Sequence, residues 1–414
     1  MKEINVNSAD CCATPGLITV EQAIDKILSS AAAVTEMESV EILDALNRVL
    51  AEDISSTINV PGYDNSAMDG YAVRSADCQQ QGVELAVSQR IPAGQVGVLL
   101  QAGTAARIFT GAPIPEGADA VVMQEMCDAA DGKVKINTVV EAGCNIRNAG
   151  EDIAEGGVVL SSGMKLRPQE LGLIASVGTA EFKVKRRLRV AAFFTGDELV
   201  TPGEPLASGQ IYNSNRYTLR GLLQAMDCEI IDLGIVPDTL EDTTDVLERA
   251  AVEADLVITS GGVSVGEEDY VRIALEKLGE LNMWRIAMKP GKPVAFGRVK
   301  DALFIGLPGN PVSVFVTFLL FARPLILKMQ GSSDFRAKPL TVVADFDWRK
   351  VKRQEYLRAR LVQQDDRLVA QIYSKQGSGV LSSASWSEGL VEVPLEQAIN
   401  RGDSVSYLSF QGLF

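Results

Sequence analysis

Apolar and polar positions alternate with two different periods between residues 187 and 330. Short apolar runs at 189–194, 229–235 and 256–259 predict strands, and the stretches 213–226 and 240–254, in which an apolar residue returns every three or four positions, predict helices. Strands that alternate with helices form a parallel sheet with right-handed crossovers. We therefore expect an α/β domain here, with a ligand site at the carboxyl ends of its strands.

The N-terminal part of the chain follows a helical pattern. Residues 19–33 predict a helix whose start carries a capping box of Thr19 and Gln22, and residues 39–50 predict a second helix. The first sixteen residues have no such pattern and are expected to form a loose tail.

Two other regions favour strands. Residues 56–150 are rich in glycine, proline and short β-like runs, so we expect a mostly β domain there. A helix is expected near 168–177. After Gly331 the pattern returns to short strands, which predict a small β domain at the C-terminus.

The composition fits a cytoplasmic protein of several domains. The chain has 414 residues, of which 46% are hydrophobic. Its longest apolar stretch, 312–327, is interrupted by Arg323 and Pro324 and is expected to be a buried helix rather than a membrane span. No apolar segment typical of a signal peptide is visible at the N-terminus. The six cysteines are scattered without a CxxC pair, which fits a reducing compartment.

Charge and the lack of histidine narrow the chemistry. The net charge of −15 opposes non-specific nucleic-acid binding, so an anionic ligand needs a local basic group. The chain has no histidine, which excludes Ser-His-Asp triads, Cys-His dyads and histidine metal sites. A bound metal is therefore expected to be hard and held by oxygen atoms, which points to Mg²⁺.

A glycine-rich segment, TSGGVSVG at 259–266, connects a predicted strand to a predicted helix. Its glycines let backbone N–H groups approach an oxyanion, and the helix N-terminus adds a favourable dipole. A plain tight turn is the alternative. The three acids at 267–269 fit either charge capping of that helix or magnesium bridging to phosphate.

Acids also follow the other predicted strands of this region. Glu198, in TGDEL, is well placed for a ligand hydroxyl or a metal, with a solvated turn as the alternative. Asp238, in IVPD, fits a metal or water ligand and fits equally well the N-cap of a helix that begins near Thr239. The residues leave both roles open.

Two turns are candidate anion sites. KPGKP carries Lys289 and Lys292, with Arg285 four residues before Lys289, and forms the best local basic cluster for a phosphate or a metal oxyanion. In GLPGNP, Asn310 fits an N-cap and Pro311 the first helical residue, so the helix start presents free N–H groups. A well-capped buried helix is the alternative for the second turn.

The β-rich region contains polar, glycine-bearing segments of the same kind. VPGYDNSAMDGYA, at 60–72, holds two glycines and two tyrosines within thirteen positions, which favours a binding loop over a plain strand. FTGAP, at 109–113, and the segment 145–152 have a similar character.

Seven of these segments, in order, resemble motifs of the molybdopterin molybdenumtransferases, the MoeA family, and the E domain of gephyrin is similar. They are PGYDNSAMDGYAVR, FTGAPIPEGADAVVMQE, NIRNAGEDI, FFTGDEL, SGGVSVGEEDY, KPGKPVAFG and GLPGNPVS. The similarity runs from about residue 17 to the C-terminus.

The resemblance implies a multidomain α/β fold. It implies a linker domain at 17–55 and 152–186, split around an inserted β-rich domain at 56–151. An α/β domain similar to the molybdopterin-binding fold follows at 187–335, and a C-terminal β barrel at 336–414. The subunit is expected to form an elongated homodimer.

The implied activity belongs to molybdenum cofactor biosynthesis. It is the magnesium-dependent insertion of molybdate into adenylylated molybdopterin with release of AMP. The site is expected between the α/β domain of one subunit and the inserted β domain of its partner. Other proteins of cofactor biosynthesis are candidate partners, and neither nucleic acid nor a membrane is expected.

The family's functional residues carry over to the matched motifs. Catalytic roles are expected for Asp69, Thr110, Asp152, Glu198, Asp238, Asp269 and Lys289. Three of these acids, Glu198, Asp238 and Asp269, are expected to hold Mg²⁺. Substrate contacts are expected from Arg147, Gly261, Gly262, Ser264, Gly266, Arg285, Lys292, Pro308, Pro311 and Ser378.

The chain departs from the family pattern at a few positions. Arg285 stands where relatives often have lysine, so a planar guanidinium replaces a point-like ammonium. Asn148 and Ala149 stand where some relatives carry further arginine. Lys375 and Gly379, near Ser378, stand where some have histidine.

Two other functions are open at this stage. One is a scaffold that binds the pterin without turnover, and the other is an adenylyltransferase that acts on molybdopterin itself. The matched acids and Lys289 favour turnover. The MDGYAV and GEDI segments, which single-domain adenylyltransferases lack, favour insertion.

Overall fold

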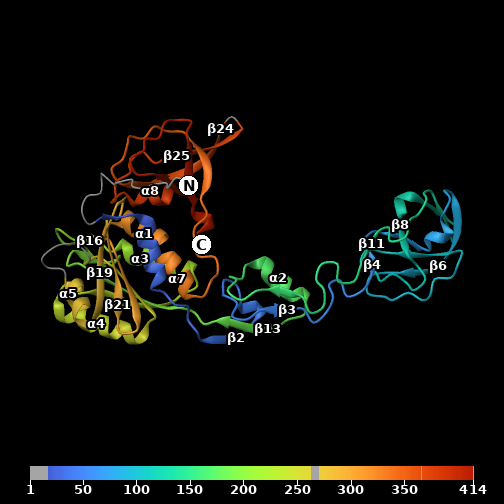
Figure 1. The fold of residues 1–414 in the computed structure, drawn as a ribbon, viewed down its shortest axis with the longest axis horizontal. Helices are drawn as coiled ribbons and strands as arrows, with labels where there is room; N and C mark the ends of the chain where they lie inside the picture. Colours follow the sequence, from blue (N-terminus) through green and yellow to red (C-terminus); the bar gives the residue numbers. More distant parts are fainter. Residues whose placement is uncertain (1–16, 263–269, 365, 414) are drawn as a thin grey trace, which may run out of the picture.

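The molecule is elongated, with its β-rich region at one end (Figure 1). The computed structural model describes residues 17–262, 270–364 and 366–413. A small linking region lies in the middle, and an α/β domain and a β barrel share the other end (Figure 1).

The α/β domain is built on a seven-stranded sheet. In spatial order its strands are β1 (Leu17–Ile18), β19 (Gly279–Ile286), β21 (Pro293–Val299), β22 (Ala302–Leu307), β18 (Leu256–Ser260), β14 (Arg189–Thr195) and β17 (Glu229–Val236). The four strands from β22 to β17 are parallel, as predicted. Strand β21 runs antiparallel to both β19 and β22. The tight connection between β21 and β22 forces the chain to reverse direction, so the sheet is mixed.

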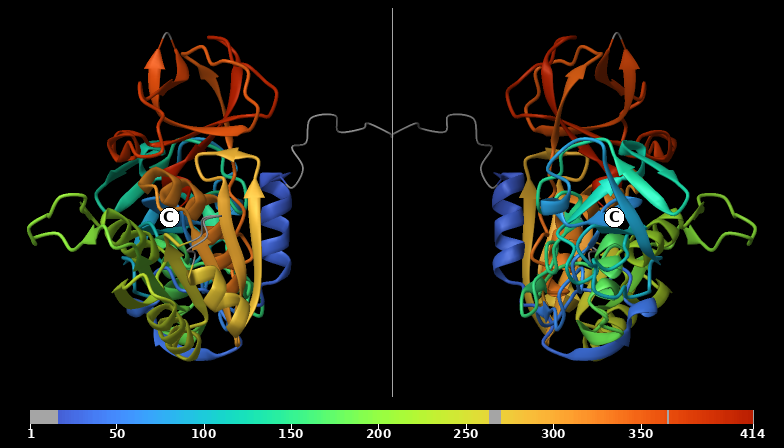
Figure 2. Two further views of the ribbon diagram at one scale, coloured as in Figure 1. Left: turned by 90° about the vertical axis from the view of Figure 1, so that its left-hand side faces the viewer. Right: turned by 90° about the vertical axis from the view of Figure 1, so that its right-hand side faces the viewer.

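Helices cover both faces of this sheet (Figure 2). One face carries α1 (Val20–Ser29), α3 (Ser214–Ala225) and the continuous helix Pro311–Met329, which includes α6 (Pro311–Thr317) and α7 (Arg323–Met329). The other face carries α4 (Leu240–Glu253) and α5 (Tyr270–Leu278). Strand β14 explains the two layers, because alternate residues along a strand point to opposite faces. Phe194 is buried in the first core and Phe193 in the second.

Local signals predicted the helix starts correctly. The side chains and backbones of Thr19 and Gln22 form the capping box that begins α1. Asn213 caps α3 by accepting a hydrogen bond from the Arg216 N–H. The helix Pro311–Met329 is long and apolar enough to cross a membrane by length and composition, but 89% of its apolar window is buried inside the protein. The interpretation of this stretch as a buried helix is confirmed.

The helix predicted over residues 39–50 is wrong. Strand β2 (Met37–Glu41) pairs antiparallel with β13 (Glu181–Lys185), and the 3₁₀ turn Ile42–Asp44 follows it. Val40 packs against the buried cluster that contains Phe182. Pairing with a strand far along the chain outweighs the local helical preference, because strand formation depends strongly on cross-strand packing.

The linking region and the β-rich region lie next to each other along the long axis of the molecule (Figure 1). The linking region also holds α2 (Pro168–Ser176) and the pair β3 (Ile54–Ser55) and β12 (Val158–Leu160). The β-rich region has a six-stranded sheet of β8 (Ala120–Met123), β5 (Gly70–Val73), β7 (Thr104–Ile108), β6 (Val83–Ile91), β10 (Lys133–Ile136) and β9 (Cys127–Ala130). Beside it, β4 (Asn65–Ser66) pairs with β11 (Ile146–Arg147).

The C-terminal region closes into a five-stranded barrel, as expected (Figure 2). Its strands are β24 (Gln354–Gln364), β25 (Arg367–Ile372), β23 (Leu340–Ala344), β27 (Ser404–Ser409) and β26 (Gly389–Val393), and β26 pairs back with β24. Strand β20 (Met288–Lys289) of the α/β domain pairs with β24. The barrel is therefore joined to the α/β domain through the backbone of the predicted lysine turn.

Candidate active site

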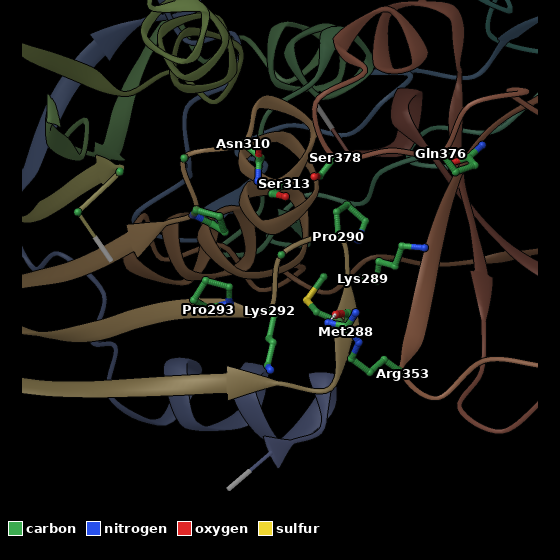
Figure 3. Close-up of a pocket in the computed structure, with 15 residues that line it drawn as sticks. Met288, Lys289, Pro290, Lys292, Pro293, Asn310, Ser313, Arg353, Gln376 and Ser378 are labelled. Atoms are coloured by element: carbon green, nitrogen blue, oxygen red, sulfur yellow. Dashed lines mark hydrogen bonds between the residues drawn. The ribbon is translucent and has the colours of Figure 1, made fainter. Parts of the chain in front are cut away.

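A cleft of about 540 Å³ lies between the α/β domain and the barrel (Figure 3). Its lining brings together segments that the sequence analysis singled out separately. The lining residues are Gly261, Gly262, Met288, Lys289, Pro290, Gly291, Lys292, Pro293, Pro308, Gly309, Asn310, Ser313, Arg353, Gln376 and Ser378. Clefts of this size are typical of small-molecule sites.

The glycine segment begins where β18 ends, and two of its glycines cannot be replaced without strain. Gly261 and Gly262 have positive φ angles of 102° and 62°. A Cβ on Gly262 would lie 2.6 Å from a methyl of Val271 and 2.9 Å from the hydroxyl of Thr195. The backbone here therefore lies too close to Val271 and Thr195 for a side chain, and the predicted approach to an oxyanion stays a prediction.

The KPGKP turn supplies two ammonium groups. Lys289 and Lys292 both line the cleft, and their side chains leave the turn in different directions (Figure 3). The Lys289 ammonium lies 3.4 Å from a carboxylate oxygen of Glu355 in the barrel. Gly291 has a φ of 101°, and a Cβ there would meet the side chain of Thr317 at 2.3 Å.

The start of α6 differs in detail from the sequence prediction. Asn310 is the N-cap residue and Pro311 the first helical residue, as predicted, but the Asn310 side chain makes no capping hydrogen bond. The Val312 N–H donates to the carbonyl of Ser378 at 3.0 Å. One N–H group at the helix start is therefore bound by the barrel rather than available to an anion. Pro308 and Ser378 line the cleft as expected.

Two polar residues hold the LPGN turn, namely Ser260 of the glycine segment and Asn215, which the sequence analysis missed. The Asn215 side-chain amide donates to the Ser260 hydroxyl at 2.9 Å and to the Gly309 carbonyl at 2.7 Å. Ser260 in turn donates to the Pro308 carbonyl at 3.3 Å. Asn215 follows the helix cap in the sequence NSN, a polar cluster that was a usable signal.

The barrel contributes two further lining residues that the sequence analysis also missed, Arg353 and Gln376. Arg353 donates to the Met288 carbonyl at 3.4 Å. It closes the run RKVKR at 349–353, which is a denser basic cluster than KPGKP. Local charge density was therefore the signal that could have found it.

The predicted acids at the strand ends do not form a metal cluster among the described residues. Glu198 follows β14 and Asp238 follows β17, and these two strands are parallel neighbours. The N-cap of α4 is Thr239, so the capping role for Asp238 is wrong. Across residues 17–262, 270–364 and 366–413, no three cysteine, aspartate or glutamate side chains come close enough to hold an ion. Magnesium binding stays a prediction.

Part of the glycine segment lies outside the described residues. This part contains Ser264, Gly266 and Asp269, and with them Glu267 and Glu268. Their expected roles in substrate and metal binding stay predictions.

Asp69 and Thr110 come together in the β-rich region. One Asp69 carboxylate oxygen accepts hydrogen bonds from the Thr110 N–H at 2.8 Å and from its hydroxyl at 2.7 Å. These bonds, the backbone one first, hold the pKa of Asp69 below its usual value. Asp69 therefore carries its charge at neutral pH.

The remaining predicted residues lie away from the described lining of the cleft. Arg147 is on β11 and Asp152 follows it at the junction with the linking region. Arg285 is exposed on β19, where it pairs with Leu17 and Pro293. The β-rich region, which contains Asp69 and Thr110, lies at the opposite end of the elongated molecule from the cleft (Figure 1). A single chain does not bring the two groups together.

Comparisons with known proteins match the whole described architecture. Residues 18–178 match the MoeA N-terminal region (domain I and II), residues 191–328 match a probable molybdopterin binding domain, and residues 341–410 match the MoeA C-terminal region (domain IV).

Individual relatives give the same result. The chain is 43% identical to molybdopterin molybdenumtransferase of Haemophilus influenzae over 96% of this chain and 100% of the relative. It is 38% identical to molybdopterin molybdenumtransferase 2 of Mycobacterium tuberculosis over 86% and 90% of the two chains. The crystal structure of a moeA protein of molybdopterin biosynthesis from Pyrococcus horikoshii superposes with a TM-score of 0.81 at 30% identity, over 95% and 100% of the chains.

These matches cover almost the full chain and almost the full length of each relative. They confirm the fold class and the enzyme class that the seven motifs implied. The chain belongs to the molybdopterin molybdenumtransferase family of molybdenum cofactor biosynthesis enzymes.

Proposed function

We propose that this chain inserts molybdate into adenylylated molybdopterin in a Mg²⁺-dependent reaction that releases AMP. The observation that carries the proposal is the charge of the cleft. Its described lining holds Lys289, Lys292 and Arg353 and no carboxylate, in a chain with a net charge of −15. A local excess of positive charge in an acidic protein suits a ligand that carries a pyrophosphate and an oxyanion.

The chain's own groups have defined tasks in this reaction. The backbone N–H group of Gly262 and the cationic side chains bind the anionic oxygens, because the Gly261 N–H already donates to the Leu307 carbonyl at 3.2 Å. The Lys289 ammonium neutralises the negative charge that grows on the phosphate as AMP leaves. Asp69, which is ionised at neutral pH, is suited to orient water or a cation rather than to donate a proton.

Magnesium would be held by oxygen donors. Glu198 and Asp238 follow adjacent parallel strands, and together with Asp269 and the phosphate oxygens of the substrate they offer the ligands that Mg²⁺ prefers. When bound, the ion supplies charge neutralisation on the pyrophosphate. The described acids alone do not make up a three-ligand site.

The complete site is proposed to form between two copies of the chain in a cytoplasmic homodimer. Asp69 and Thr110 lie at one end of the molecule and the cleft at the other (Figure 1). A second copy that runs in the opposite direction would bring its β-rich region to the cleft, as a two-fold axis allows.

The test is incubation of the purified protein with adenylylated molybdopterin, molybdate and Mg²⁺. We expect AMP release and formation of active cofactor. Lys289→Ala should lower the rate of AMP release by about 10²-fold, because a charge-neutralising group is lost. Lys277→Ala, at an exposed position of α5, is the matched control and should keep the wild-type rate. The absence of AMP release by the wild-type protein would sink the proposal.

A further inference from the structure

We propose that Glu355 is the counter-ion and positioning residue of Lys289, and that it sets how tightly the cleft holds phosphate-bearing ligands. The inference rests on the proposed function, because Lys289 is taken to act on an anionic substrate. It assigns a role in the site to the C-terminal barrel, which otherwise contributes only lining residues.

The pairing of two backbone strands brings Lys289 and Glu355 together. Strand β20 runs parallel to β24, and in this register Lys289 lies beside Glu355. Their ammonium nitrogen and carboxylate oxygen are 3.4 Å apart. Side chains of paired residues on adjacent strands share one face of the sheet, so the contact follows from the strand pairing itself. Figure 3 shows the Lys289 side chain extending toward the barrel.

Glu355 is held more firmly than a surface acid. Its side chain is only 9% exposed, whereas that of Lys289 is 38% exposed. The second carboxylate oxygen accepts a hydrogen bond from the Trp348 indole N–H at 3.2 Å. A carboxylate that is almost buried is stable when its charge is matched, and here Lys289 and the nearby buried Arg358 supply positive charge while Trp348 supplies a hydrogen bond. The carboxylate is therefore the more buried partner of the pair, and the lysine is the more exposed one.

This arrangement makes Glu355 a competitor of the ligand. Within the described part of the chain, the charged side chains at the cleft near Lys289 are Lys292 in its own turn and Arg353 and Glu355 from the barrel. Of these three described groups, only Glu355 is negative. A phosphate that enters the cleft must share the Lys289 ammonium with a carboxylate that is almost buried and held by Trp348. Glu355 therefore weakens anion binding and at the same time fixes the direction of the ammonium.

A purely structural role for Glu355 makes different predictions. If Glu355 served only to tie the barrel to the α/β domain, its replacement would lower stability and leave anion affinity unchanged. Glu355→Gln keeps the shape and an oxygen acceptor for Trp348 but removes the charge, so it separates the two roles.

The experiment measures pyrophosphate binding by calorimetry to the wild type, Glu355→Gln and Glu355→Asp. We expect Glu355→Gln to bind pyrophosphate about fivefold more tightly, because an opposing charge is lost. Glu355→Asp keeps the charge and should return to within about twofold of wild type. Glu392→Gln is the matched control. Its carboxylate lies in the same barrel and accepts from Gln354 and Ser406, so its loss should leave pyrophosphate binding unchanged.

Turnover gives the second readout. With adenylylated molybdopterin, Glu355→Gln should lower KM, because the substrate no longer competes with a carboxylate for the Lys289 ammonium. It should also lower kcat by about tenfold, because the ammonium loses the group that orients it. Equal pyrophosphate affinity in the wild type and Glu355→Gln would overturn the inference. If the wild type releases no AMP, the proposed function fails, and the pyrophosphate comparison still decides the role of Glu355.

Tryptophan emission keeps the test valid if Glu355→Gln does not fold. Trp348 touches Glu355 directly, so pyrophosphate that draws Lys289 away should change the emission of the wild-type protein. The change should be lost in Trp348→Phe, which retains Trp284 and Trp386. A wild-type emission that does not respond to saturating pyrophosphate contradicts the inference.

Discussion

At the scale of single residues, Asp69 and Thr110 show how two separate motifs make one functional unit. Thr110 gives the Asp69 carboxylate both its backbone N–H and its hydroxyl, and these donors lower the pKa of the acid. A carboxylate with a lowered pKa contributes stability above its unfolded pKa, and this contribution is lost as the pH falls through the folded pKa. The Asp69 carboxylate is therefore charged throughout the neutral pH range.

Thr110→Val should raise the pKa of Asp69 above its wild-type value while leaving it below the ordinary value. The hydroxyl is lost, but the backbone N–H, which has the larger effect, remains. An NMR titration of the Asp69 carboxyl carbon measures the change. Thr104→Val, at the start of β7, the strand that precedes Thr110, is the control, because the Thr104 hydroxyl donates to the Gln101 carbonyl instead. Identical Asp69 titrations in wild type and Thr110→Val would contradict this account.

At the scale of elements, the starts of β14 and β18 are fastened by one carboxylate. Asp255 accepts two hydrogen bonds from the Arg186 guanidinium, at 2.7 and 2.8 Å, and one from the Arg189 N–H at 2.9 Å. Burial raises the pKa of Asp255, but the hydrogen bonds from Arg186 and Arg189 outweigh it and leave the pKa lowered. Arg186 lies where the chain passes from the linking region into the α/β domain, so Asp255 also anchors that passage.

Asp255→Asn should therefore reduce the free energy of unfolding by about 2 kcal/mol at neutral pH, because arginine groups lose a charged partner. The difference from wild type should shrink as the pH falls through the lowered pKa of Asp255, where the wild-type carboxylate also becomes neutral. Thermal unfolding from pH 7 to acid measures both effects. Asp301→Asn, at an exposed position in the turn before β22, should unfold like the wild type at every pH. A pH-independent difference for Asp255→Asn would argue against the charge as its cause.

At the scale of the whole molecule, the long axis separates the two groups of predicted site residues. The β-rich region with Asp69 and the cleft with Lys289 occupy opposite ends, joined by the linking region (Figure 1). A site that needs both groups has to be shared between two chains.

Mixing of two impaired variants tests whether the site is shared between subunits. Asp69→Ala and Lys289→Ala should each release AMP at a small fraction of the wild-type rate when alone, and a mixture that exchanges subunits should regain about a quarter of the wild-type rate. Half of the mixed dimers are hybrids, and each hybrid has one site with both native residues. Size-exclusion chromatography confirms the dimers. Mixtures that gain no activity after proven exchange would show that the two residues do not meet across subunits.

Prediction from the sequence succeeded where the signal is local. The capping box of Thr19 and Gln22 and the strand at 189–194 each depend on residues within a few positions of one another, and the structure confirms them. It failed at residues 39–50, where β2 forms only because β13 pairs with it. The same limit explains why the roles of Asn215 and Glu355 were missed, since each is defined by a partner far along the chain.

By itself the sequence determined the family, the order of the domains and the identity of the cationic turn, because these follow from motifs and periodicity that the chain carries locally. Only the tertiary structure decided which of these segments meet. It placed the glycine segment, the lysine turn and the barrel around one cleft, and it left Asp69 and Thr110 at the far end. Contacts such as Lys289 with Glu355 arise from strand register between domains, and register is set by packing over the whole fold.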